Sequence, residues 1–211
     1  MLNVVSMLKF VLTATLVLAF LPLCAKAADK QDFVNWLQHF DSINAQFKQV
    51  LKDEANFIEE HSSGRVAISR PGKFRWDYIE PEEKLVLADS AKLYVWEKDL
   101  EQVSIYRQSD IMEDLPLSWL THKTDLAAEF ILNVGEFVRG TQFFSLVPKK
   151  GNQIDRIEVG LKVGNLSQIN LFDANGQVTY IRFINPRMND KLPESLFEMN
   201  LPKDADILGE S

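Results

Sequence analysis

The chain has 211 residues, 46% of them hydrophobic, and carries 23 basic against 30 acidic side chains, for a net charge of −7. This acidic balance disfavours a nucleic-acid-binding protein, because neutralising phosphates requires a basic surface. The single cysteine, Cys24, excludes an intrachain disulfide framework.

The first 27 residues have the form of an export signal. Lys9 is followed by an apolar run, residues 10–23, that is too short for a membrane span, and Ala25-Lys26-Ala27 has the small-x-small form of a cleavage site. We therefore predict that residues 1–27 are cleaved. The loss of two lysines and no acids leaves 184 residues with 21 basic and 30 acidic side chains, a net charge of −9. This length predicts one domain, residues 28–211.

Cys24 allows a second interpretation of the same segment. In a lipoprotein signal, the cysteine would carry the lipid anchor, but such a signal has a small residue just before the cysteine, and here that residue is Leu23. We expect cleavage after Ala27, which leaves a mature chain without cysteine. A chain without cysteine suits an oxidising compartment, since nothing is left to mispair.

The mature chain begins with a predicted helix over residues 29–40, whose apolar side chains recur at helical spacing and whose first turn is acidic. After Ser42 the period changes to two, with Ile43, Ala45 and Phe47 on one face, and this alternation predicts a strand. Further short strands are predicted near residues 65–70, 73–80, 84–88, 92–97, 100–107, 142–148, 154–163, 166–173, 177–185 and 195–200.

Two short helices, near residues 114–120 and 125–132, are predicted in the middle of the chain. The fold class is therefore mainly β with a few helices (α+β), built on one large, curved antiparallel sheet. The helices must cover one face of this sheet. A sheet that curls around helices without enclosing them leaves a cleft.

The stretch at residues 70–78, Arg-Pro-Gly-Lys-Phe-Arg-Trp-Asp-Tyr, places three aromatic side chains on one face of a strand. Phe74, Trp76 and Tyr78 alternate with charged residues, and alternate side chains of a strand point to opposite faces. The aromatic residues form either half of an ordinary sheet core or the wall of a binding site.

Catalytic motifs are absent from the sequence. The three histidines have no metal-ligand spacing with one another or with Cys24, and there is no Gly-x-Ser-x-Gly element and no glycine-rich phosphate loop. Acidic pairs such as Glu82-Glu83 are interpreted as solvated turns. We therefore predict no enzyme activity, no catalytic residue, no metal and no cofactor.

Several of these segments, taken in order, resemble the outer-membrane lipoprotein carrier (LolA) family, and the resemblance extends over essentially the whole mature chain. They are Ile43-Asn44-Ala45-Gln46-Phe47-Lys48-Gln49, Arg70-Pro71-Gly72-Lys73-Phe74-Arg75-Trp76, Leu93-Tyr94-Val95-Trp96, Asp99-Leu100-Glu101-Gln102-Val103, Leu115-Pro116-Leu117 and Phe197-x-Met199-x-x-Pro202. Two turns differ from the family pattern, which commonly has Asp-Gly where this chain has Asp89-Ser90 and Pro where it has Lys98.

The resemblance implies an unclosed β-barrel capped by a helical lid over an apolar cavity. Arg70 matches the arginine that holds the lid closed through hydrogen bonds to the lid helices, and Phe74 and Trp76 match positions in the cavity wall. The expected acyl-chain cavity as a whole comprises Phe47, Phe74, Trp76, Tyr78, Leu117 and Leu120.

The resemblance also implies a monomeric periplasmic shuttle without stable membrane insertion. Such a protein binds the acyl chains of lipoproteins released by an inner-membrane ABC transporter and delivers them to an outer-membrane receptor. Three alternatives stay open: a sensor domain of the same fold that binds lipids or lipoproteins, a glycolipid carrier, and a receptor lipoprotein if Cys24 is acylated.

Overall fold

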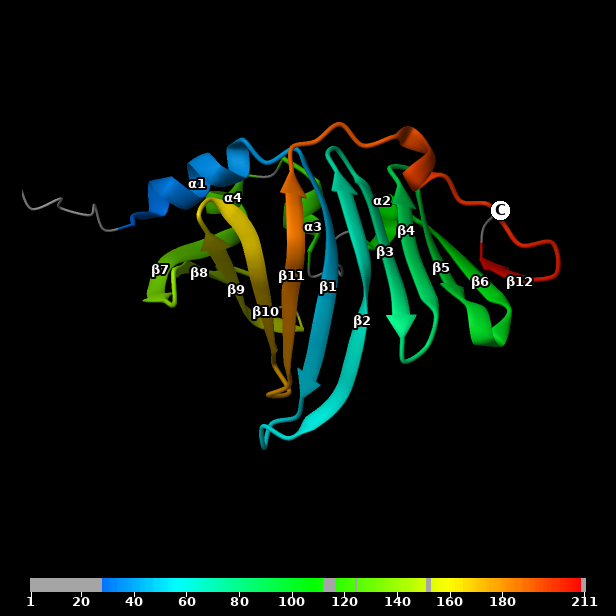
Figure 1. Cartoon of the computed structure of the whole chain (residues 1–211), viewed down its shortest axis with the longest axis horizontal. Coiled ribbons are helices and arrows are strands. Elements are labelled where there is room, and N and C mark those ends of the chain that lie inside the picture. The colour runs from blue at the N-terminus through cyan, green and yellow to red at the C-terminus, as the bar shows by residue number, and fades with distance from the viewer. Residues whose placement is uncertain (1–27, 112–116, 124, 151–152, 210–211) are drawn as a thin grey trace, which may run out of the picture.

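Twelve strands form one curved sheet, shown in Figure 1. The computed structural model describes residues 28–111, 117–123, 125–150 and 153–209, so the predicted signal peptide lies outside the described residues. The strands are β1 (Ser42–Lys52), β2 (Ile58–Ser69), β3 (Lys73–Glu80), β4 (Lys84–Asp89), β5 (Lys92–Glu97), β6 (Gln102–Arg107), β7 (Phe130–Val138), β8 (Thr141–Pro148), β9 (Ile154–Lys162), β10 (Asn165–Asp173), β11 (Val178–Met188) and β12 (Asp206–Gly209).

The order of the strands in the sheet is β12-β6-β5-β4-β3-β2-β1-β11-β10-β9-β8-β7. All neighbours are antiparallel except β6 and β12, which pair in parallel. Strands β7 and β12 are the two edges and do not pair with each other, so the barrel is unclosed. The predicted fold class, a curved and mainly antiparallel sheet with a few helices, is confirmed.

The helices are short, and all but the first lie between strands in the chain. They are α1 (Lys30–Gln38), α2 (Gln108–Ile111), α3 (Ser118–Thr121), α4 (Leu126–Glu129) and the 3-10 helices η1 (Lys98–Leu100) and η3 (Glu194–Phe197). Helix α1 begins at a capping box, in which the Asp29 carboxylate accepts the Asp32 N–H (3.0 Å) and the Asp32 carboxylate accepts the Asp29 N–H (2.8 Å). The helix predicted at residues 29–40 is thus confirmed.

Helices α1 and α3 cover the concave face of the sheet, which lies away from the viewer in Figure 1. The ring of Phe33 in α1 is fully buried, with its centroid 5.0 Å from that of Phe144 in β8 and 6.3 Å from that of Trp119 in α3. Both helices and the inward side chains of the strands therefore share one hydrophobic core. We refer to α1 and α3 together as the lid.

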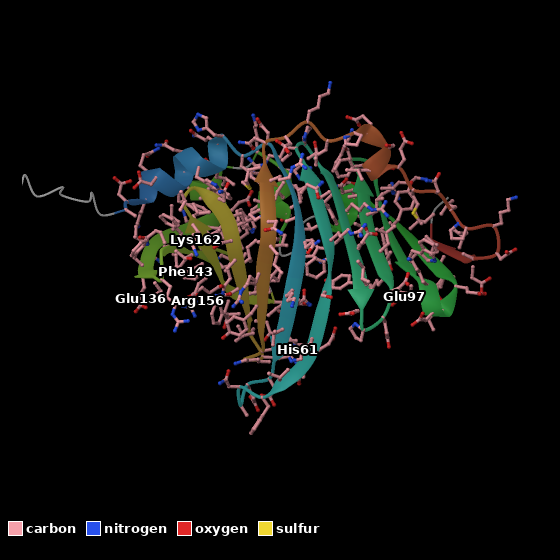
Figure 2. All side chains as sticks on the ribbon, in the orientation of Figure 1. His61, Glu97, Glu136, Phe143, Arg156 and Lys162 are labelled. Atoms are coloured by element: carbon pink, nitrogen blue, oxygen red, sulfur yellow. The ribbon has the colours of Figure 1, made fainter. Side chains whose placement is uncertain are left out.

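The C-terminal segment, residues 189–209, runs along the end of the sheet at which β11 finishes, from β11 to β12 (Figures 1 and 2). Its 3-10 helix η3 contacts β3 and β4 and buries Phe197 to 3% exposure. Beneath it, the outward side chains of β4 and β6 are also buried: Leu85, Leu87, Val103 and Ile105. This convex face thus has a hydrophobic cluster of its own.

One predicted element is wrong in type and another is too long. The strand expected near residues 195–200 is η3 followed by irregular backbone, because Phe197 packs onto the convex face instead of pairing with a neighbouring strand. The helix expected at residues 125–132 ends at Glu129. Phe130 already begins β7, where Phe130 pairs with Pro148 and Leu132 with Leu146 of β8.

The turn between β4 and β5 shows the consequence of one departure from the family pattern. Ser90 adopts a left-handed backbone (φ 84°), the conformation that glycine reaches without steric cost. Its hydroxyl donates a hydrogen bond to the Pro71 carbonyl at 3.0 Å. This serine therefore ties the turn to the loop that precedes β3.

Candidate functional site

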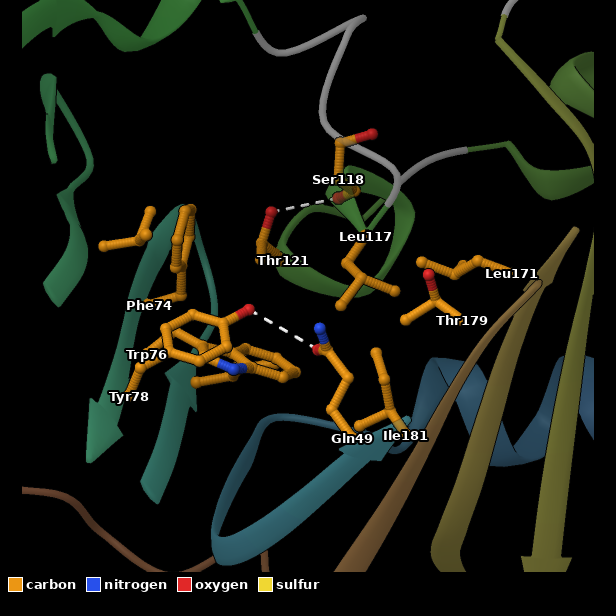
Figure 3. Close-up of a pocket in the computed structure, with 12 residues that line it drawn as sticks. Gln49, Phe74, Trp76, Tyr78, Leu117, Ser118, Thr121, Leu171, Thr179 and Ile181 are labelled. Carbon is orange, nitrogen blue, oxygen red and sulfur yellow. Dashed lines mark hydrogen bonds between the residues drawn. The ribbon is translucent and has the colours of Figure 1, made fainter. Parts of the chain in front are cut away.

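A cavity of about 310 Å³ lies between the concave face of the sheet and the lid. Figure 3 shows its lining, in which residues from β3 face residues from β1, β10 and β11 beneath α3. The lining residues are Gln49, Ile68, Phe74, Trp76, Tyr78, Val86, Leu117, Ser118, Thr121, Leu171, Thr179 and Ile181. Most of this surface is apolar, and none of these side chains carries a formal charge at neutral pH.

The aromatic part of the lining comes from the alternation of β3. Phe74, Trp76 and Tyr78 all point to the concave face, where they lie opposite Ile68, Val66 and Gly64 of β2. Gly64 is required here, because a Cβ at this position would lie 1.8 Å from the Asp77 carbonyl oxygen and 2.9 Å from the Phe47 ring. The absence of a side chain lets the Phe47 ring reach Tyr78.

Phe47 and Leu120 lie behind this lining, in the core. The Phe47 ring centroid is 4.9 Å from that of Trp76 and 5.2 Å from that of Tyr78, the latter in an edge-on arrangement. Leu120 belongs to α3 of the lid and is fully buried in the core. These two predicted site residues support the cavity wall, whereas Phe74, Trp76, Tyr78 and Leu117 line the cavity itself.

Arg70 directly follows β2 and donates hydrogen bonds to both lid helices and to Phe40, two residues after the end of α1. Its guanidinium donates to the carbonyl oxygens of Leu37 (2.8 Å), Phe40 (3.1 Å), Trp119 (3.1 Å) and Leu120 (2.9 Å). The last carbonyls of a helix lack intrahelical partners and carry the negative end of its dipole, so a planar five-donor cation is well suited to them. One side chain therefore joins α1 and α3 to the sheet.

Burial changes the acid–base properties of two of these residues. Desolvation lowers the pKa of Arg70 to about 10, against the opposing field of Asp41, so the guanidinium remains cationic at neutral pH. Desolvation, helped by Glu60, raises the pKa of Tyr78 to about 12, and its hydrogen bond to Gln49 opposes this shift. Tyr78 is therefore a neutral phenol throughout the physiological range.

Several lining residues were not predicted from the sequence. Gln49 of β1, Leu171 of β10, and Thr179 and Ile181 of β11 complete the wall opposite β3. Alternation along residues 166–173 and 177–185 indicates which side chains share a face. It does not reveal that β11 pairs with β1, more than 120 residues away in the chain.

Residues 28–111, 117–123, 125–150 and 153–209 contain neither a candidate metal site nor a helix that could span a membrane. No three His, Cys, Asp or Glu side chains in these ranges are close enough together to hold a metal ion. No described helix is long and apolar enough to cross a membrane.

Comparisons with known proteins agree on one family. The model of the family described as "Outer membrane lipoprotein carrier protein LolA" matches residues 38–200. The outer-membrane lipoprotein carrier protein of Dechloromonas aromatica is 31% identical over 206 residues, covering 97% of this chain and 99% of that protein. The protein of the same name from Cupriavidus taiwanensis is 35% identical over 192 residues, covering 89% and 90%.

A solved structure supports the fold alone. An uncharacterized conserved protein from Thermus thermophilus superimposes with a TM-score of 0.56 at 15% identity, covering 84% of this chain and 97% of that one.

Proposed function

Because the chain belongs to the outer-membrane lipoprotein carrier family, we propose that it is a carrier that shields the acyl chains of lipoproteins during transfer. In this proposal residues 1–27 are a cleaved signal and residues 28–211 work as one domain, a monomer in the periplasm. An inner-membrane ABC transporter supplies the lipoprotein, and an outer-membrane receptor takes it.

The observation that carries the proposal is the uncharged, aromatic-lined cavity beneath the lid. Each CH₂ group moved from water to apolar surroundings gains roughly 0.8 kcal/mol, so a chain of about fifteen such groups gains on the order of 12 kcal/mol. Free desorption of such a chain into water is therefore negligible. A carrier must offer an apolar surface of its own, and Phe74, Trp76 and Leu117 provide one.

The size of the cavity implies a second state. A volume of about 310 Å³ is at the lower end of the range of roughly 300–1,000 Å³ typical of sites for one small ligand. Several long acyl chains need more room, so the lid must move away from the sheet when cargo enters. We assign the structure to the closed state, in which lid side chains occupy part of the acyl site.

Arg70 is the proposed latch of this closed state. Its four hydrogen bonds reach the carbonyls of both lid segments, and none of its acceptors is a carboxylate. When the lid opens, water molecules can accept the hydrogen bonds that Arg70 donates to these carbonyls in the closed state. Loss of these bonds, about 1.5–3 kcal/mol in total, shifts the lid equilibrium roughly ten- to hundredfold toward the open state.

The test compares loading with release. Wild type, Arg70→Leu and the control Arg75→Leu, an arginine on the opposite face of the sheet, are loaded with a fluorescent triacylated lipopeptide at matched folded concentration. They are then mixed with an outer-membrane fraction. We expect Arg70→Leu to load at least as well as wild type and to retain its cargo, because the competing closed state is destabilised. Arg75→Leu should release cargo as wild type does.

Two results would count against these assignments. Equal release from wild type and Arg70→Leu would remove Arg70 from the mechanism. A wild-type protein that takes up no lipopeptide would overturn the carrier function.

A further inference from the structure

The cavity wall contains hydrogen-bond donors that the described residues leave without acceptors. The indole Nε1 of Trp76 is buried, and no acceptor lies within reach of it in the described part of the chain. Trp76 as a whole is 7% exposed and lines the cavity. A buried N–H without a partner is costly, and native proteins rarely keep one unless a ligand or a water satisfies it.

Gln49 provides a second donor beside the first. Tyr78 donates its hydroxyl hydrogen to Gln49 Oε1 at 3.5 Å, as the dashed line between these side chains in Figure 3 shows. This bond orients the amide, and its Nε2 group makes no hydrogen bond to any side chain or backbone group that the structure describes. Gln49 and Trp76 both line the cavity, so both donors belong to one wall.

The position of these groups along the strands gives the cavity a direction. Phe74 lies nearest Arg70, Trp76 follows, and Tyr78 lies farthest along β3. Gln49 lies toward the same end of the cavity as Tyr78, because β1 and β3 both run away from the lid. The Gln49–Tyr78 pair therefore lies at the end of the cavity away from Arg70, whereas Ser118 and Thr121 of α3 bring hydroxyl groups to the lid side.

The chemistry of the wall selects one class of ligand group. A carboxylate or a phosphate would lose its hydration without gaining a counter-ion, because no lining side chain is cationic. A pure hydrocarbon would leave both donors unsatisfied. The carbonyl oxygen of an ester or an amide fits, since it is neutral and accepts hydrogen bonds.

We propose that Trp76 Nε1 and Gln49 Nε2 bind the carbonyl oxygens of the ester and amide bonds that join acyl chains to the cargo. The inference rests on the proposed carrier function and adds that the cavity recognises the acyl linkage as well as the hydrocarbon. The linkage then lies beside Gln49 and Trp76, and the chains extend along the apolar lining, which includes Phe74, Leu117 and Ile181.

Two synthetic probes test this recognition. Both are peptides with an N-terminal S-(propyl)cysteine that carries two C16 chains, attached through ester bonds in one and through ether bonds in the other. Their dissociation constants are measured with the full mature chain by displacement of bis-ANS. Wild type should bind the ester probe about two- to tenfold more tightly than the ether probe, the ratio expected for one net neutral hydrogen bond.

The ratio is then compared within each variant, so that any general change in affinity cancels. Trp76→Phe and Gln49→Leu should each lower the ester-to-ether ratio, and the variant with both substitutions should bring it close to one. Gln46→Leu, on the same strand as Gln49 but exposed on the outer face, is the matched control and should keep the wild-type ratio. If wild type prefers the ester probe and the Trp76 and Gln49 variants keep the same ester-to-ether ratio, the assignment of these two donors is overturned.

The remaining outcomes separate this inference from the function on which it rests. If wild type binds both probes with equal affinity, the linkage site is overturned and the acyl-chain carrier stands. If wild type binds neither probe, the carrier function is overturned as well.

Discussion

The two faces of β3 are covered by different parts of the chain, and an arginine ties each cover to the sheet. On the concave face, Arg70 donates only to backbone carbonyls of the lid segments. On the convex face, Arg75 forms a two-bond ion pair with Asp77 of its own strand (2.7 and 3.0 Å) and donates one longer bond to the Leu196 carbonyl (3.3 Å). Lys73 adds an ion pair with Glu194.

The apolar packing of the two covers also differs. Beneath the lid, a cavity of about 310 Å³ remains, so part of the apolar contact between lid and sheet is missing. Beneath the C-terminal segment, Leu87 and Val103 are fully buried and Phe197 is 3% exposed. Both covers bury apolar side chains, among them Phe33 and Trp119 of the lid and Phe197 of the C-terminal segment. We infer that the convex cover is held more tightly, whereas the lid, which has this cavity beneath it, depends more on the bonds of Arg70, which can break and re-form.

The largest effect should come from breaking the convex cover. Phe197→Ala should lower the free energy of unfolding by about 3–5 kcal/mol, because it leaves a hole over β3 and β4 that no ligand fills. Urea denaturation measures this change. Leu201→Ala, on the same segment but 48% exposed, should change the stability by less than about 0.5 kcal/mol. A loss below about 1 kcal/mol for Phe197→Ala would mean that the convex cover is as loosely held as the lid.

A smaller, local effect should distinguish the two arginines. In Arg70→Leu, amide hydrogen exchange in α1 should become roughly ten- to hundredfold faster, while η3 is unchanged, because opening the lid costs about 1.5–3 kcal/mol less. Arg75→Leu should leave exchange in α1 at the wild-type rate. Hydrogen exchange resolved by peptide checks both variants, and equal protection of α1 in wild type and Arg70→Leu would contradict the reversible cover.

The smallest effect concerns Tyr78 and alkaline pH. Tyrosine ionises near pH 10 in the unfolded chain, whereas folding raises the pKa of Tyr78 to about 12. The unfolded state therefore binds fewer protons between these values, and the free energy of unfolding falls as the pH rises from about 10 to about 12. Tyr78→Phe should lack this part of the decline and differ from wild type by less than about 1 kcal/mol at pH 8.

Urea midpoints at pH 8 and pH 11 measure the difference, with Tyr106→Phe, a half-exposed ring outside the cavity lining, as the control for losing one phenol. If the free energy of unfolding falls equally for wild type and Tyr78→Phe between pH 8 and pH 11, Tyr78 does not lie in a desolvated wall.

The concave face was more predictable from the sequence than the convex one. The alternation at Phe74, Trp76 and Tyr78 gives the aromatic face directly, and the acidic first turn marks the start of α1. At the C-terminus, Phe197-x-Met199 has the same alternation, yet Phe197 belongs to a 3-10 helix. Local periodicity does not reveal that this ring packs on the convex face over β3 and β4.

The site itself was predictable only in part. The four acceptors of Arg70 are backbone carbonyls, which leave no trace in a residue pattern, so its position came from the family resemblance. Thr179 and Ile181 complete the wall only because β11 pairs with β1, a contact between segments far apart in the chain. Phe130 lies within the helix predicted at residues 125–132, but its pairing with β8 makes it the first residue of an edge strand.

The unclosed sheet has a mechanical consequence. In a closed barrel, strand number and shear fix the radius. Here β7 and β12 are separate edges, so the circumference is not fixed, and small changes in twist between neighbouring strands can widen or narrow the curve with every ladder hydrogen bond intact. We therefore expect the curvature of the sheet, and with it the width of the cavity, to adjust to the size of a bound ligand without any strand leaving its neighbour.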